Sequence, residues 1–154
     1  MAKIGSFSSD IKKFQKGLER VRRQDRKAFM EDCAKELAAR LLRKVIKRTP
    51  VGDYPKSSGK LGGTLRRGWT GGKSVSAAAY ANSLAIDQAG DMVRIEIINP
   101  VEYAAYVEYG HRTASHKGWI PGKFMLTISE KELRSIAPAV LEKRLAKYLE
   151  DTFG

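Results

Sequence analysis

Apolar side chains in the first third of the chain recur with the period of a helix. Residues 25–49 carry them at steps of four positions, which places them on one face and predicts a long amphipathic helix. Pro50 should end this helix, because the residue before a proline is pushed out of the helical conformation. Residues 11–21 have the same phase, and charged residues interrupt the stripe near residue 24, where we expect a break or a kink. The stripe of the long helix consists of Phe29, Cys33, Leu37, Leu41 and Val45.

The middle of the chain changes from helical period to alternation. Residues 92–98 nearly alternate between apolar and polar side chains, as expected for a half-buried strand. Residues 83–87 precede them across a turn candidate at 88–91, so these segments predict an antiparallel hairpin. Residues 64–70 are a candidate for a short further strand, whereas 74–82 have no clear assignment.

Glycine, serine and lysine are frequent in residues 51–63, which predicts a flexible loop. Such a composition buries too little apolar surface to offset the entropy lost on ordering. Gly59-Lys60 suggests a phosphate-binding loop, but the spacing of glycines that such a loop needs is missing. No nucleotide site is therefore expected here.

Two further helices are predicted in the last third of the chain. Asn99 can cap the first, and Gly110 should stop it after about three turns. Residues 119–122 then have a turn signature. A capping pattern at 127–130 predicts the start of a C-terminal helix, which Pro138 should kink or divide.

Together these elements predict an α+β fold. We expect a small antiparallel sheet packed by the long N-terminal helix and the C-terminal helix, with the short helix between them. A length of 154 residues indicates a single domain over 1–154. Trp69 and Tyr103 are expected in its core, and no apolar run approaches the length that spans a membrane.

The net charge of +12 is unevenly distributed along the chain. Residues 1–50 contain 15 basic and 6 acidic residues, whereas residues 81–154 have nearly balanced charges. Two interpretations remain open for this basic segment: contact with nucleic acid, or a solvated face that meets an acidic neighbouring protein. The candidate basic surface on the outward face of the long helix consists of Arg40, Arg43, Lys44 and Lys47.

Catalytic and metal-binding patterns are weak in this sequence. His111 and His116 lie in one loop, and Cys33 is remote from them, so they do not form a recognisable zinc set. His111 with Glu108 could do acid–base chemistry, but a surface histidine after a helix stop is more common. Cys33 on an apolar stripe is expected to be a small buried side chain. We expect no cofactor and no enzymatic activity.

Residues 103–125 contain Tyr-Ala-x-Tyr-Val-Glu-Tyr-Gly-His-Arg followed by Gly-Trp-x-Pro-Gly-x-Phe-Met. This segment resembles the minor tail-component family of long-tailed bacteriophages, the tail completion proteins similar to the minor tail protein Z of lambda. A second similarity joins Arg-Thr-Pro-Val-Gly at 48–52 to Gly-Thr-Leu-Arg-Arg-Gly-Trp at 63–69. The stretch 57–63 is longer than the family's pattern at this point.

The resemblance implies a structural protein without catalysis at the head-proximal end of a phage tail. It implies a ring of six copies around the tube through which DNA passes, other tail or neck proteins as partners, and transient contact with DNA. The protein would be found in the virion, and in the host cytoplasm during assembly. The alternative function is a basic, non-sequence-specific nucleic-acid-binding protein.

The aromatic segment after residue 102 also has two interpretations. Its side chains either pack on the sheet as core or face a neighbouring subunit, where Tyr, Trp and Arg are favoured. The resemblance favours the second. The candidate subunit interface consists of Tyr106, Tyr109, His111, Arg112 and Trp119.

Overall fold

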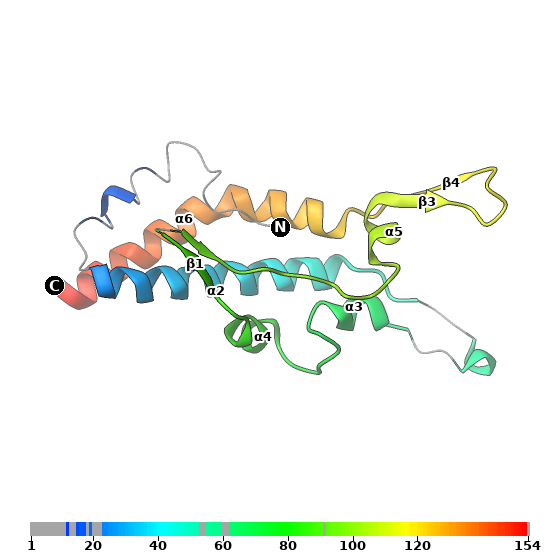
Figure 1. Cartoon of the computed structure of the whole chain (residues 1–154), viewed down its shortest axis with the longest axis horizontal. Coiled ribbons are helices and arrows are strands. Elements are labelled where there is room, and N and C mark those ends of the chain that lie inside the picture. The colour runs from blue at the N-terminus through cyan, green and yellow to red at the C-terminus, as the bar shows by residue number, and fades with distance from the viewer. Residues whose placement is uncertain are drawn as a thin grey trace.

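Two long helices form the body of the molecule. The computed structural model describes residues 12, 15–17, 19, 23–52, 55–59, 62–90 and 92–153. Within it, α2 (Arg23–Arg48) and α6 (Met125–Phe153) lie side by side along the long axis (Figure 1). Their apolar stripes face each other, which confirms the helix predicted for 25–49. This core consists of Phe29, Cys33, Leu37 and Leu41 from α2, and Leu133, Ala137, Leu141 and Leu145 from α6.

The ends of these helices differ in part from the prediction. Residues 15–17 are helical, but most of the predicted helix over 11–21 and the expected break near residue 24 lie at or outside the limits of the described residues. The α6 helix begins at Met125, two residues before the expected capping pattern. It continues through Pro138 as one helix, so the expected division does not occur.

The strand expected over 64–70 is wrong, because this segment forms helix α3 (Thr64–Gly68). Gly63, with φ 90°, precedes the helix in a left-handed conformation, and the Arg67 amide donates to the Gly63 carbonyl at 2.9 Å. Leu65 and Trp69 are four positions apart, so one helical turn places both against α2. Each is only 4% exposed. Burial of this pair therefore decides the local conformation.

The unassigned stretch after residue 74 contains helix α4 (Ala77–Ser83). The Ser76 side chain accepts a hydrogen bond from the Ala79 amide at 3.1 Å, as an N-cap residue does. Ala81 is fully buried against α2. The second core cluster formed here consists of Ala38, Ala39, Leu42, Val45, Leu65, Trp69, Ala81 and Met125.

The first hairpin is shorter than predicted and shifted along the chain. Strand β1 (Asp87–Ala89) pairs antiparallel with β2 (Met92–Arg94), and Gln88 lies opposite Val93. The alternation predicted for 92–98 continues beyond the paired residues, because Ile95 and Ile97 are half-buried in the core clusters. The predicted faces are therefore confirmed although the ladder is short.

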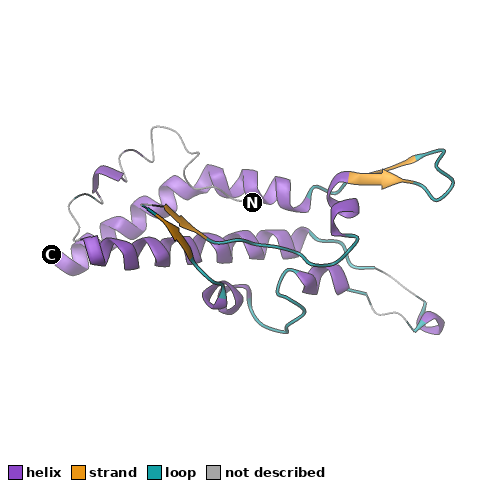
Figure 2. Cartoon of the chain, viewed as in Figure 1, coloured by secondary structure: helices purple, strands orange, loops and turns teal. Residues whose placement is uncertain are grey.

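A second hairpin occupies the place where a turn was expected. Strand β3 (Gly110–Arg112) pairs antiparallel with β4 (Trp119–Pro121), so the turn predicted at 119–122 is a strand. Figure 2 shows the two hairpins apart from each other beside a largely helical body. The α+β fold is confirmed: the two long helices pack on each other, α3 and α4 pack on α2, and two separate two-stranded sheets lie beside them.

The short helix between the hairpins is α5 (Ala104–Tyr109), which begins later than predicted. Asn99 does not cap it. The Asn99 side chain instead accepts from the Val101 amide at 3.1 Å and donates to the Leu65 carbonyl at 2.8 Å. Gly110 ends α5 as predicted. In the loop predicted at 51–63, residues Lys56–Ser58 form an exposed 3-10 helix, and the flexibility of this loop stays a prediction.

Candidate assembly surface

The second similarity to the tail-component family consists of two segments, 48–52 and 63–69. These segments meet at Thr49, which is fully buried. The Trp69 indole Nε1 donates to the Thr49 hydroxyl at 2.8 Å, and that hydroxyl donates to the Val45 carbonyl at 2.6 Å. The Arg66 guanidinium donates to the Thr49 carbonyl through Nε at 3.1 Å and Nη2 at 2.6 Å. These residues therefore hold α3 against the C-terminal end of α2.

Gly68 lets residues 99–101 pass close to α3. A Cβ atom at this position would collide with Asn99 Oδ1 and with the Val101 side chain. Because Asn99 also bonds to the Leu65 carbonyl, the chain entering α5 is fixed on α3. The buried end of α2 thus positions α5 through a short series of contacts.

Glu108 joins α5 to the start of α6. Its two carboxylate oxygens accept hydrogen bonds from the Leu126 amide at 2.9 Å, the Thr127 amide at 2.9 Å and the Thr127 hydroxyl at 2.8 Å. A helix leaves its first amides without partners inside the helix, and a carboxylate there is also favoured by the helix dipole. Glu108 is 6% exposed and performs the capping role that the sequence suggested for 127–130.

The segment that leads from the second hairpin into α6 also bonds to the end of α5. The Lys123 amide donates to the Val107 carbonyl at 2.7 Å, and the Phe124 amide donates to the Glu108 carbonyl at 3.0 Å. Gly122 packs so closely on the end of α5 that a Cβ atom would collide with the Glu108 carbonyl. Residues 110–121, which we call the arm, therefore leave and re-enter the body at one fixed point.

The predicted interface residues gather on α5 and the arm. Tyr106 is 61%, Tyr109 64% and Trp119 60% exposed, and Arg112 is also exposed. His111 is half-buried, and its ring lies 5.6 Å from that of Tyr106 between centroids. We call this set the aromatic surface: Tyr106, Tyr109, His111, Arg112 and Trp119.

Exposure of these rings argues against the core-packing interpretation. Tyr103, expected in the core, is also 41% exposed, so that expectation is wrong. Three further exposed apolar residues of this region were not proposed as interface residues from the sequence. They are Ile120, Phe124 and Ile128.

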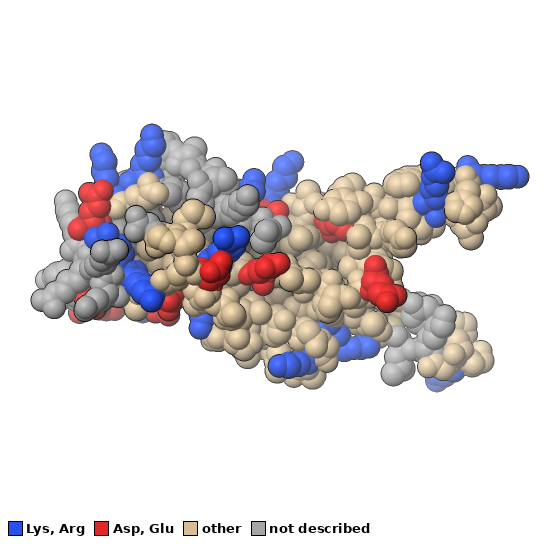
Figure 3. Space-filling view, in the orientation of Figure 1, with Lys and Arg blue, Asp and Glu red and all other residues tan. Residues whose placement is uncertain are grey.

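The arm is basic as well as apolar. Residues 109–129 include Arg112, Lys117 and Lys123 but no aspartate or glutamate. Figure 3 shows Lys and Arg side chains on the arm, which projects from one end of the molecule. The arm can therefore offer both apolar and cationic contacts to a partner.

Two residues of the candidate basic surface on α2 are paired with carboxylates. Lys44 is half-buried, and its Nζ lies 3.2 Å from Glu132 Oε2 on α6. Arg40 lies 3.9 Å from Glu36 one turn earlier. Arg43 and Lys47 are exposed. Arg43, Lys44 and Lys47 line one open pocket together with Arg48 and Glu132, so most of the candidate basic surface lies together, and its role stays a prediction.

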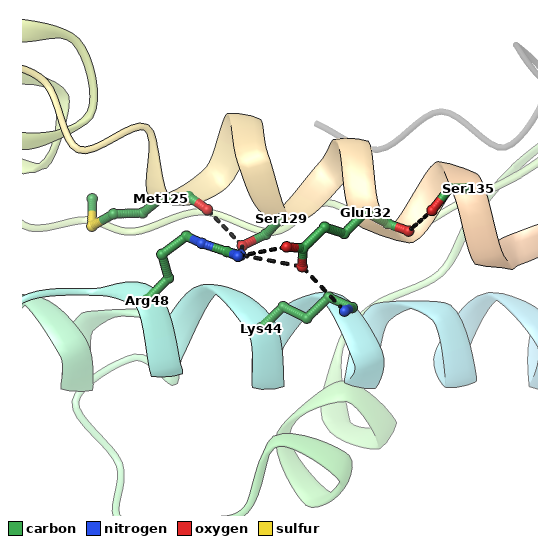
Figure 4. A network of polar contacts seen from close by, with 6 residues as sticks. All are labelled: Lys44, Arg48, Met125, Ser129, Glu132 and Ser135. Carbon is green, nitrogen blue, oxygen red and sulfur yellow. Dashed lines mark hydrogen bonds and ion pairs between the residues drawn. The ribbon is translucent and has the colours of Figure 1, made fainter.

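Figure 4 shows the network that holds Lys44. Arg48 Nη2 donates to Glu132 Oε1 at 2.6 Å, and its Nη1 donates to the Ser129 hydroxyl at 3.1 Å. Hydrogen bonds from Arg48, and then from Lys44, hold the pKa of the Glu132 carboxyl below its ordinary value. The network links the C-terminal half of α2 to the first half of α6.

We expect the Glu132→Gln variant to lose part of the acid dependence of stability. A carboxyl whose pKa is lowered by folding stabilises the protein above its ordinary pKa of about 4.3, and this contribution disappears as the pH falls through the lowered value. The thermal midpoint of the wild type should therefore fall more steeply below about pH 4.3 than that of the variant. Melting curves followed by circular dichroism across this range would measure the difference.

Glu142→Gln is the matched control for this comparison, since Glu142 is exposed on the same helix. It should retain the acid dependence of the wild type. Equal slopes for the wild type and the Glu132→Gln variant would contradict the assignment of this network.

The described residues give little support to catalytic chemistry. Burial raises the pKa of the Cys33 thiol to about 12, which keeps it protonated at neutral pH. The Glu108 carboxylate is bonded to the start of α6, and within the described ranges no hydrogen bond joins it to His111, the partner that the sequence suggested as the less common alternative. Among the described residues, no group of three or more His, Cys, Asp or Glu side chains could hold a metal ion. In the same part of the chain, no helix is long and apolar enough to cross a membrane.

Comparison with known proteins identifies the family. The family model described as "Bacteriophage HK97-gp10, putative tail-component" matches residues 12–110, which is more than half of the chain. The matched region contains α2, both halves of the 48–69 similarity and α5, and it ends where the arm begins. No curated protein and no solved structure matched. The chain therefore belongs to the HK97-gp10-like family of bacteriophage tail components.

Proposed function

We propose that this tail component completes the head-proximal end of a phage tail by assembling into a ring. The ring would contain six copies around the path of the DNA, with other tail or neck proteins as neighbours and only transient contact with DNA. Assembly would occur in the host cytoplasm, through complementary surfaces and without catalysis. The observation that supports this proposal best is the exposed aromatic surface on α5 and the arm.

Chemistry and geometry both favour an assembly role for the aromatic surface. Tyr, Trp and Arg are the residues enriched in protein interfaces and among their energetic hot spots. Tyr106, Tyr109 and Trp119 expose 60% or more of their surface within one short segment. The hydrogen bonds of Glu108 fix this segment on the body, so little orientational freedom is lost when a partner binds.

Electron microscopy of particles made with and without this protein tests the proposed position. Particles that lack it are expected to have tails that do not join heads. The Arg112→Ala variant should change the free energy of unfolding by no more than about 0.5 kcal/mol, as exposed sites do. It should nevertheless reduce the number of joined particles.

Met92→Ala is the control substitution, because Met92 is exposed on the other hairpin. It should support normal assembly. Normal head–tail joining in the complete absence of the protein would reject the proposed position at the head-proximal end.

Free DNA binding is expected to be weak, since Lys44 and Arg40 are paired with carboxylates. We expect sequence-independent binding with a Kd of about 10⁻⁴–10⁻⁶ M near physiological salt. Reversing the exposed charges with Arg43→Glu and Lys47→Glu should disturb assembly more than it changes DNA affinity. A salt-titrated binding assay beside an assembly assay would measure both effects. Nanomolar binding that is lost in this variant while assembly survives would favour the nucleic-acid function.

A further inference from the structure

A small pocket with polar and apolar lining lies beside the aromatic surface, between the end of α2, α3 and α5. Its volume is about 220 Å³, and it is lined by Pro50, Val51, Gly52, Thr64, Tyr103 and Val107. Small-molecule pockets are usually larger, at about 300–1,000 Å³. A volume of this size equals about seven water molecules at about 30 Å³ each, which is room for one large side chain.

The arm carries large side chains that its own chain leaves exposed. Trp119 and Ile120 are 60% and 44% exposed, and they point to opposite faces of the hairpin because neighbouring strand residues alternate. A two-stranded hairpin alone is at best marginally stable. Apolar side chains on both faces of the arm therefore indicate that a partner covers it.

Trp119 does not line the pocket of its own chain. The Glu108 junction holds the base of the arm in place, so the indole remains exposed while the pocket stays open. An indole from another copy can occupy the pocket without any rearrangement of this junction.

We propose that Trp119 of one copy inserts into the pocket of the next copy, in a head-to-tail contact that closes the ring. This inference rests on the proposed assembly into a ring. A contact that joins two different surfaces of the same protein produces a ring when the rotation between copies closes. The proposal thus assigns the hairpin arm as the inserting element and the pocket between α3 and α5 as its receptor.

Charges of both signs border the pocket. The arm is cationic through Arg112 and Lys117, and residues 109–129 lack acidic side chains. Glu102 is exposed and directly precedes Tyr103, which lines the pocket. Arg67, which is also exposed, lies beside Gly63 of the pocket lining, so the cations of the arm should orient toward Glu102 and away from Arg67.

The position of both elements also suits a ring. The arm and the elements that line the pocket lie at the same end of the long axis (Figure 1). If copies are related by rotation about an axis parallel to the long axis, equivalent residues of all copies lie at the same position along that axis. The arm of one copy and the pocket of its neighbour can then meet at one level around the ring.

Cross-linking between two single variants tests this contact directly. Lys117→Cys protein is mixed with Glu102→Cys protein and treated with a short bismaleimide, both in solution and in assembled tails. Cys33 is buried and should not react. We expect a covalent dimer from the mixture and from neither variant alone. Lys117→Cys mixed with Glu142→Cys, on the C-terminal half of α6, should give none.

Self-association measured by sedimentation provides the second readout. Trp119→Ala removes the inserting side chain, and Thr64→Trp fills the pocket. Each should weaken self-association by about 30-fold or more, as truncation of an interface hot spot does. Met92→Ala, on the other hairpin, should leave the affinity within about twofold, since most exposed sites away from the contact are near neutral.

The outcomes separate this inference from the proposed ring. If wild-type copies associate and both Trp119→Ala and Thr64→Trp associate equally well, the inserted contact is rejected while the ring remains. Absence of the cross-link between positions 117 and 102 in assembled rings rejects it as well. If copies associate neither in solution nor in tails, both the ring and the inserted contact are rejected.

Discussion

Replacing Trp69 with alanine is expected to lower the free energy of unfolding by about 3–5 kcal/mol, the usual cost of truncating a large buried aromatic side chain. Trp69 is 4% exposed and packs in the core cluster with Leu42 and Val45. The substitution also removes the hydrogen bond from the indole to the Thr49 hydroxyl. Domains are usually stable by only about 5–15 kcal/mol, so this loss is a large share. Urea denaturation followed by circular dichroism would measure it.

Trp119→Ala is the matched control, because the same side chain is removed from an exposed position. It should change the free energy of unfolding of the isolated subunit by no more than about 0.5 kcal/mol. The two variants thereby separate a tryptophan that stabilises the fold from one that we assign to assembly. Equal losses of stability would contradict the division between core and assembly surface.

Replacing Glu108 with alanine should both destabilise the fold and release the arm. The amides of Leu126 and Thr127 and the Thr127 hydroxyl would lose the carboxylate that accepts their hydrogen bonds. Loss of a helix cap costs about 0.5–2 kcal/mol, and buried donors left without an acceptor cost about 1–3 kcal/mol more. We therefore expect a loss of about 2–4 kcal/mol. Denaturation curves and amide hydrogen exchange at the start of α6 would measure it.

Glu108→Gln distinguishes the capping role from simple loss of packing. This variant keeps one acceptor oxygen and nearly the same shape, so it should lose less stability than Glu108→Ala. Assembly should decrease in the same order, because the arm depends on this junction for its orientation. Unchanged exchange of the first α6 amides in the alanine variant would show that Glu108 does not fix this end.

The long α2 helix could be predicted because its signals are local. Apolar residues at steps of four from Phe29 to Val45 place one stripe on one face, and Pro50 excludes continuation. The alternation of Val93, Ile95 and Ile97 likewise predicted which side chains turn inward. Gly110 predicted the end of α5. Each of these signals lies within the element that it specifies.

Residue type was enough to select the candidate interface residues, but it could not predict that their side chains are exposed. Tyr, Trp, His and Arg between 106 and 119 suited either a core or a subunit contact, and the contacts of the folded chain left Tyr106, Tyr109 and Trp119 exposed. For the basic residues, the sequence suggested exposure where the structure shows an ion pair. Lys44 had the sequence position of a solvated residue, yet Glu132, 88 residues later, binds it.

Residues 64–70 and 119–121 show why the remaining elements escaped prediction. Leu65 and Trp69 have the spacing of a helix, but so short a segment is helical only because α2 buries both side chains. Strand β4 exists because β3 lies opposite it, with Arg112 facing Trp119.

The sequence by itself determined the long amphipathic helix, the inward faces of the alternating segment, the stop after α5 and the family. Those features depend on residues a few positions apart, whose geometry follows from backbone periodicity. Only the tertiary structure decided the capping of α6 by Glu108, the pairing of Lys44 with Glu132 and the projection of the arm. These features depend on residues that are far apart in the sequence. The local pattern allows several partners for each of them, and only packing and the need to satisfy buried hydrogen-bonding groups select one.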